Sequence, residues 1–172
     1  MRVQVGCSVK DLFCEQLGLN PEYFEERVQT IFMDGNPVDD AASTTVRADS
    51  VIAISGAMPG LVGAVMRKGG FYAPLRKEIS HREANQSETR REGDVFLKVF
   101  NILLKDLGPV FLEKGIRIMG TDLEYFIQKQ LADFWTGFRS AQKDGKDINQ
   151  KELMAAEWPN GLVFLQVLPL HL

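Results

Sequence analysis

The sequence predicts an α+β fold in two halves that pack as one unit, and three patterns carry this prediction. Short apolar runs rich in branched residues, at Arg27–Met33 and Val51–Ser55, are typical of buried strands. Apolar side chains recur at helical spacing after Ser8 and again after Thr121. Between the halves, residues 78–94 are polar and charge-rich, so we expect a linker there.

This linker divides the chain into a predicted first domain, residues 1–77, and a mixed α/β second domain, residues 95–172. With 45% hydrophobic and 25% charged residues, the composition is that of a globular protein. A net charge of −3 argues against binding dominated by nucleic-acid phosphates, and no apolar run approaches the roughly 20 residues that cross a bilayer. The opening residues do not resemble a secretory signal, so we expect a cytoplasmic protein with neither nucleic-acid nor membrane partners.

The elements of the first half follow one another closely. Arg2–Val5 alternates like a strand, Ser8 caps a helix that ends at Gly18, and Asn20-Pro21 indicates a loop. After the strand at Arg27–Met33, the turn pair Asp34-Gly35 reverses the chain. Val51–Ser55 then supplies a buried strand.

This order resembles the β-grasp, or ubiquitin-like, fold of the small sulfur-carrier proteins of thiamine and molybdopterin biosynthesis. The resemblance covers residues 3–60 and depends on three stretches: SVKDLFCEQLGL as the single helix, FMDGNPVDD as the following hairpin, and RADSVIAISGAMPG as the last central strand and its exit. It implies that the first half is a modified β-grasp module.

Two features depart from that family. Only one strand precedes the helix, so another strand must complete the sheet, and Leu61–Met66 or Phe71–Ala73 could supply it. The carriers end in a free Gly-Gly whose carboxylate is activated, whereas here Pro59-Gly60 takes that position and the chain continues. Gly69-Gly70 would form such a tail only after proteolysis; otherwise we expect a turn.

The second half opens with a predicted strand at Val95–Phe100 and a helix capped by Asn101. Gly108-Pro109 is expected to interrupt that helix, and Ile116–Met119 is a further predicted strand.

The strongest helix signal begins at Thr121, which forms a predicted capping box with Glu124, and it carries an apolar core stripe to Phe138. A second capping pattern begins at Asn149, and Leu162–Leu168 is expected to form a buried terminal strand.

The segment Gly56–Gly70, GAMPGLVGAVMRKGG, is too apolar for a solvated loop and has no strong helix pattern. It must pack against the fold or bind a partner. We predict an interaction loop made of Met58, Pro59, Gly60, Leu61, Val62 and Val65. Arg67 and Lys68 lie beside the glycines and, together with Arg76, could bind a small anion, although a solvated basic surface is the simpler interpretation.

No residue set indicates a catalytic mechanism. Cys7 and Cys14 are expected to be core thiols, while His81 falls in the linker and His171 next to the C-terminus. The spacing of these four residues indicates no metal site. The acids Asp39-Asp40 occupy a turn and indicate a solvated surface.

We therefore predict a non-enzymatic binding protein without a cofactor, acting through a protein partner or by self-association as a dimer. Two alternatives remain open from the sequence. One is a carrier or small enzyme of sulfur or cofactor metabolism, as the resemblance implies, and the other is an anion-binding enzyme that uses the basic cluster.

Overall fold

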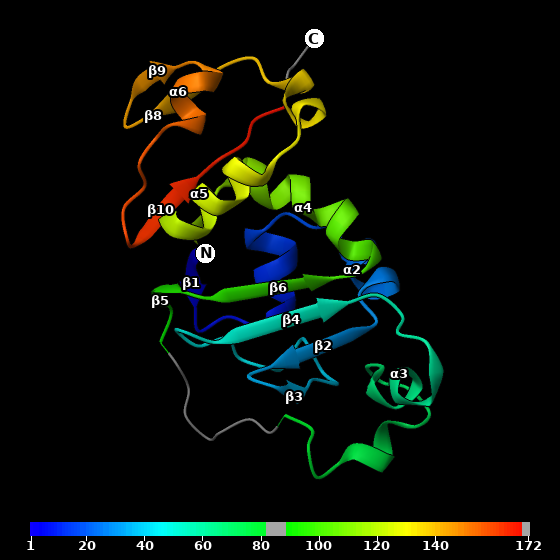
Figure 1. Ribbon diagram of the computed structural model, residues 1–172. Coiled ribbons are helices and arrows are strands. Elements are labelled where there is room, and N and C mark those ends of the chain that lie inside the picture. The colour runs from blue at the N-terminus through cyan, green and yellow to red at the C-terminus, as the bar shows by residue number, and fades with distance from the viewer. Residues whose placement is uncertain (82–88, 170–172) are drawn as a thin grey trace. The chain divides into compact units, whose positions relative to one another are not determined.

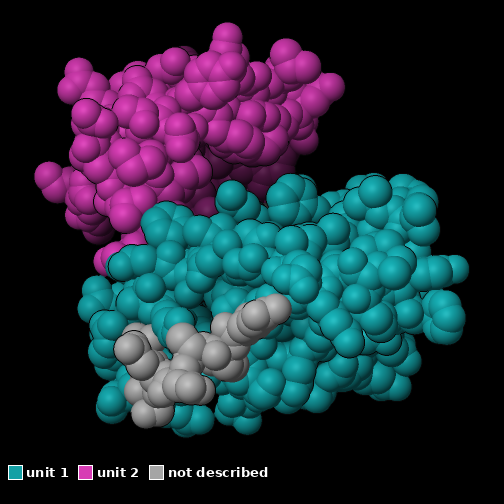
Figure 2. Space-filling view, turned by 90° about the horizontal axis from the view of Figure 1, so that it is seen from below, with its two compact units in different colours: residues 1–114, 167–172 teal, residues 115–166 magenta. Residues whose placement is uncertain are grey.

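The computed structural model describes residues 1–81 and 89–169 and shows a mixed α+β chain (Figure 1). Its two compact units are Met1–Lys114 with Val167–Leu172, and Gly115–Gln166 (Figure 2). The predicted boundary at residue 95 therefore differs from the observed division, which falls after residue 114. Residues 82–88 of the predicted linker lie outside the described residues. None of the described helices is long and apolar enough to cross a membrane.

A four-stranded sheet organises the first unit, in the order β3-β2-β4-β6. Its strands are β2 (Thr30–Met33), β3 (Asn36–Pro37), β4 (Val51–Ser55) and β6 (Phe96–Phe100). Strand β2 is antiparallel to both β3 and β4, whereas β4 and β6 are parallel. The predicted turn between β2 and β3 is confirmed, because Asp34 and Gly35 both have positive φ, 51° and 84°.

The residues just before β6 pair with a further strand, β1, which lies outside the four-stranded sheet. Strand β5 (Arg91–Asp94) is antiparallel to β1 (Arg2–Val5), and Val95 exchanges backbone hydrogen bonds of 2.8 and 2.6 Å with Met1. Residues 91–100 thus lie beside β1 along their first half and beside β4 along their second. The two sequence candidates for the missing strand were wrong, since neither Leu61–Met66 nor Phe71–Ala73 is extended in a sheet.

Short helices pack on one face of this sheet. Helix α1 (Val9–Asp11) continues into the π-helical turn η1 (Leu12–Gln16), and the predicted Ser8 cap is confirmed by a capping box with Asp11. Helix α2 (Pro21–Arg27) replaces the expected loop, because the Asn20 side chain accepts hydrogen bonds from two backbone N–H groups of its first turn.

The core of this unit lies between the sheet and these helices. Phe13 and Phe24 stack with ring centroids 5.7 Å apart, and both are fully buried beside the inward-facing side chains of the strands. The largest fully buried residues are Phe13, Phe24, Leu12, Ile31, Met33, Ile52, Ile54 and Leu103.

Helix α4 (Ile102–Lys114) corrects two predictions. It runs without interruption through Pro109, which is exposed, because Leu107 and Phe111 on either side bury their side chains. Asn101 does not cap the helix. It adopts a left-handed φ of 51° and binds the end of β4 instead, donating to Ser55 Oγ at 2.7 Å and accepting from the Gly56 N–H at 3.1 Å.

The second unit contains two small antiparallel sheets and three helical segments. Its elements are β7 (Ile116–Met119), α5 (Gly120–Lys129), η3 (Ala132–Gly137), β8 (Ala141–Lys143), β9 (Lys146–Ile148), α6 (Gln150–Met154) and β10 (Leu162–Leu165). Strand β7 pairs with β10, and β8 with β9. Leu123, Ile127 and Trp135 form its core.

The long helix predicted from Thr121 to Phe138 is in fact two pieces. Helix α5 begins at Gly120 without a side-chain cap and ends at Lys129, and the chain is extended at Leu131 before η3. A Cβ at position 120 would overlap the Pro159 carbonyl oxygen, so a glycine is required where α5 begins. The capping box of Asn149 is confirmed.

We predict that Asn101→Ala lowers the free energy of unfolding more than Asn101→Gly does. Both variants lose two side-chain hydrogen bonds, at about 1 kcal/mol each, and alanine adds the strain of a left-handed φ, about 1 kcal/mol more. Urea denaturation measures both changes. Equal stabilities of the two variants would show that the backbone conformation of Asn101 is not a constraint.

Candidate functional site

The segment between β4 and the described end at His81 is the candidate site (right and bottom of Figure 1). After Gly56 it forms helix α3 (Gly60–Met66) and the 3₁₀ turn η2 (Ala73–Arg76), and it returns to the sheet where His81 donates its N–H to the Pro37 carbonyl at 2.8 Å. The glycine at position 63 is required, because a Cβ there would overlap the Met58 backbone.

Arg76 fixes this segment to the sheet. Its guanidinium is 1% exposed and forms two hydrogen bonds with the Asp39 carboxylate, of 3.0 and 2.6 Å. It also donates to the Val65 and Arg67 carbonyl oxygens, at 2.7 and 3.3 Å, and to Ser80 Oγ at 2.8 Å. A guanidinium has five N–H donors, so every donor of Arg76 is used.

Lys68 provides a second attachment, to α2. Its backbone N–H donates to the Gln29 carbonyl at 2.8 Å, and its ammonium lies 3.0 Å from the Glu25 carboxylate and 4.8 Å from the centre of the Phe24 ring. Lys10 binds the other oxygen of Glu25 at 2.8 Å. Hydrogen bonds from Lys10 and Lys68 lower the pKa of the Glu25 carboxyl.

The structure therefore separates the three residues of the predicted anion site. Arg76 and Lys68 are already paired with Asp39 and Glu25 of the same chain. Arg67 is exposed, and its guanidinium has no hydrogen bond or ion pair within the described residues. Anion binding remains a prediction, and Arg67 is the member whose charge is not matched by a described carboxylate.

Large apolar side chains of the same segment point to solvent. They are Leu61 (71% exposed), Val62 (69%), Phe71 (89%), Tyr72 (42%), Leu75 (75%) and Ile79 (49%), and we call them the apolar surface. They lie on or beside α3 and η2, which are in contact, and the Phe71 and Tyr72 rings meet edge to face at 5.1 Å. The segment thus buries Arg76, shields most of Lys68 and exposes six of its large hydrophobic residues, the reverse of the usual distribution.

The predicted interaction loop coincides with only part of this surface. Leu61 and Val62 belong to it, Pro59 and Gly60 are exposed beside it, and Met58 and Val65 are half-buried. Sequence reasoning missed Phe71, Tyr72, Leu75 and Ile79. The signal that could have found them is a dense run of apolar residues interrupted by Gly, Pro and paired basic residues, with no helical or strand period.

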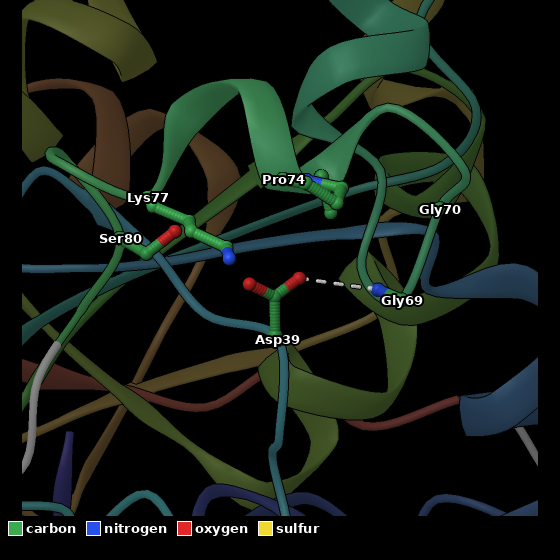
Figure 3. A pocket seen from close by; sticks show the side chains of 7 residues that line it. Asp39, Gly69, Gly70, Pro74, Lys77 and Ser80 are labelled. Carbon is green, nitrogen blue, oxygen red and sulfur yellow. Dashed lines mark hydrogen bonds between the residues drawn. The ribbon is translucent and has the colours of Figure 1, made fainter.

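A cavity of about 540 Å³ adjoins the apolar surface (Figure 3). It is lined by Asp39, Gly69, Gly70, Ala73, Pro74, Lys77 and Ser80. The side chains of Lys77 and Ser80 extend toward the Asp39 carboxylate, which also accepts the Gly69 N–H at 3.2 Å. The cavity therefore has walls of small apolar and backbone groups and a charged rim.

The described residues offer little to a nucleophilic mechanism. Burial raises the pKa of both thiols, Cys7 and Cys14, so they stay protonated at neutral pH. Cys7 is buried and donates to the Gln4 carbonyl at 3.2 Å, whereas Cys14 is only half-buried. No group of three or more potential metal ligands occurs within residues 1–81 and 89–169. His171 lies outside the described residues.

These features define the class of site: an ordered segment on a mixed α+β unit, attached by two ion pairs whose cations are largely shielded and whose carboxylates are exposed, and bearing exposed apolar side chains. Comparison with known proteins found no matching protein family, no matching curated protein and no matching solved structure.

We predict that Arg76→Ala loosens the segment locally. Losing hydrogen bonds to a charged group costs about 2 kcal/mol, which raises the population of the locally open segment about 20- to 30-fold. Chymotrypsin cleavage next to Phe71 measures this opening. Arg67→Ala is the matched control, because it removes an exposed guanidinium from the same segment. Equal cleavage rates for the two variants would show that the Asp39 pair does not order it.

A second prediction concerns pH. The Glu25 pKa is lowered in the folded chain, so its contribution to stability is complete above its unfolded pKa and is lost as the pH falls through its lower folded pKa. Between pH 6 and pH 3, urea denaturation should show a larger loss of stability for the wild type than for Glu25→Gln. Parallel losses in the two proteins would contradict a stabilising role for Glu25.

Proposed function

We propose that this protein is a non-enzymatic binding module that uses the apolar surface to hold a protein partner. The observation that carries the proposal is the inverted polarity of residues 56–81: the Arg76 side chain is 1% exposed, whereas apolar side chains of the same segment are up to 89% exposed. Exposed clusters of large apolar residues are typical of interaction sites.

The attachment of the segment supports this proposal. Binding costs less free energy when the contact residues are already ordered, because less conformational entropy is lost. Arg76 and Lys68 hold α3 and η2 in place without using their large apolar side chains. Those side chains thus remain available to a partner.

We further propose that the first unit is a β-grasp module with a rearranged strand order along the chain. Its support is the pairing of residues 91–100, which lie antiparallel to β1 and parallel to β4. The family's fold begins with a β-hairpin. In this arrangement β1 corresponds to the second strand of that hairpin, and residues 91–100 take the place of the first. The apolar segment then begins where the sulfur carriers have their tail.

The carrier alternative receives no comparable support. Gly60 begins α3, and Gly69 and Gly70 both donate backbone hydrogen bonds, to Asp39 and to the Arg67 carbonyl. Neither Pro59-Gly60 nor Gly69-Gly70 is a free end in this arrangement. The binding function is therefore the one that we put forward.

The proposal predicts that Leu61→Asp weakens partner binding or self-association at least tenfold. A buried leucine contributes about 1.5–3 kcal/mol to an interface, and each 1.4 kcal/mol is a factor of ten in Kd. Leu104→Asp is the matched control, because Leu104 is 57% exposed on α4 of the same unit. Affinity capture with quantitative mass spectrometry, together with light scattering, compares the three proteins. Identical captured proteins and identical masses throughout would overturn the proposal.

A further inference from the structure

We infer that the open edge of β6 is a second binding site, separate from the apolar surface, which takes an extended peptide segment by strand addition. The peptide lies antiparallel to β6 and carries an acidic residue between two apolar ones. The inference depends on the unpaired backbone groups of this edge, on its exposed apolar side chains and on the lysine in the middle of the strand.

Strand β6 is an edge strand of the four-stranded sheet, and its backbone pairs with β4 on one side (Figure 1). Phe96 donates its N–H to the Ser50 carbonyl at 2.9 Å, so its backbone groups face β4. These directions alternate along a strand, so the N–H and C=O groups of Leu97 and Val99 face away from β4. Among residues 1–81 and 89–169 they have no hydrogen-bond partner. A row of such groups is a template for another strand.

Strand β1 already occupies the preceding part of the same row. Val95 exchanges hydrogen bonds of 2.8 and 2.6 Å with Met1, and β1 continues from there along β5. The unpaired groups of Leu97 and Val99 come next after those of Val95. A peptide added to β6 therefore lies in line with β1 and runs in the same direction, because both are antiparallel to residues 91–100.

The side chains of β6 fit a peptide that alternates in polarity. Leu97 and Val99 lie on the core face of the sheet but are only half-buried. Apolar residues of the peptide opposite them extend the core and remove this surface from water. On the other face, Phe96 and Phe100 are 55% and 52% exposed, with the exposed Lys98 between them. The central residue of the peptide lies on this face, opposite Lys98.

Lys98 determines the charge of that central residue. Its ammonium forms no ion pair or hydrogen bond in the part of the chain that the structure describes. Its nearest neighbours on the same face are Phe96, Phe100 and Ala53, none of which is charged. Opposite charges that face each other across two antiparallel strands stabilise the pairing, whereas like charges destabilise it. An acidic residue is therefore favoured at the centre of the peptide.

A second copy of this chain fits the edge poorly. The unpaired groups belong to Leu97 and Val99, so a two-fold pair of β6 strands must have its axis at Lys98. The two Lys98 residues then face each other with their Cα atoms about 4.5 Å apart, which destabilises the pair. Other registers need Val95, which β1 already occupies, or Asn101, whose φ of 51° ends the strand.

The test is a displayed library of random ten-residue peptides, selected on the wild-type protein and depleted on Val99→Pro. Proline at this position removes an N–H that does not pair with β4, which an edge strand tolerates. Val99→Thr is the matched control, because it keeps the N–H and nearly the same shape. We expect enriched peptides with an acidic residue between two apolar ones. Their affinity should fall about tenfold for Val99→Pro and remain within about twofold for Val99→Thr and Leu61→Asp.

A charge reversal provides a second measurement. One enriched peptide is synthesised with either Glu or Lys at its central position, and NMR titration follows the amide signals of Leu97 and Val99. The wild type should bind the Glu form about fivefold more tightly than the Lys form. Lys98→Glu should reverse this preference. A loss of stability alone cannot reverse a preference between two peptides.

The contrary results are distinct. No enrichment on the wild type relative to a folded Val99→Pro would overturn the inference, and thermal unfolding establishes whether that variant is folded. If it is not, the charge reversal decides: the same peptide preference in the wild type and Lys98→Glu overturns the inference. Binding that is lost with Leu61→Asp would assign the peptides to the apolar surface instead. A dimer in light scattering that Lys98→Ala strengthens would show that the occupant is a second copy.

Discussion

The bidentate contact between Arg76 and Asp39 is the interaction on which the candidate site depends. Residues 56–81 bury no large apolar side chain; their buried members are Gly56, Gly63 and Arg76. The hydrophobic effect therefore contributes little to ordering this segment, although ordering it costs conformational entropy. The hydrogen bonds of the buried Arg76 guanidinium, two of them to the Asp39 carboxylate, supply stabilisation instead. One side chain joins the loop after β3 to the end of α3 and to η2, so three elements become ordered together.

The sheet determines where this segment begins and ends. Asn101, which follows β6, binds Ser55 and Gly56 at the end of β4, so the parallel strands β4 and β6 are tied together where both leave the sheet. At its other described end, the segment is bound to β3 through the Pro37 carbonyl. Both ends of the segment are attached, and Arg76, near its second end, adds the contact with Asp39, so the segment is held at the edge of the sheet.

Local patterns predicted the elements whose residues interact with near neighbours. The strands at Arg2–Val5 and Val51–Ser55, the turn at Asp34-Gly35 and the caps at Ser8 and Asn149 follow from short-range chemistry and are confirmed. The terminal strand expected to be buried over Leu162–Leu168 ends at Leu165, and its side chains are exposed or half-buried because, within the described residues, it pairs only with β7. Helix α2 was missed because Asn-Pro is compatible with a loop and with a helix start. The role of Asp39 could not be predicted, because its partner lies 37 positions away and adjacent acids in a turn indicate solvated charges. The pairing of residues 91–100 with β1 and β4 could not be predicted either, because its partners also lie far away in the sequence.

The polarity of the segment also explains how it can present one definite face. A segment with apolar residues on both sides could bury either side, because hydrophobic attraction has no preferred direction. The planar guanidinium of Arg76, in contrast, fits the Asp39 carboxylate in one orientation, which determines the side of η2 that faces inward. A collapse that buried the apolar side chains by turning η2 over would have to break the hydrogen bonds of a guanidinium that is 1% exposed, and the loss of these bonds opposes it. The buried charge therefore keeps Phe71 and Leu75 directed outward.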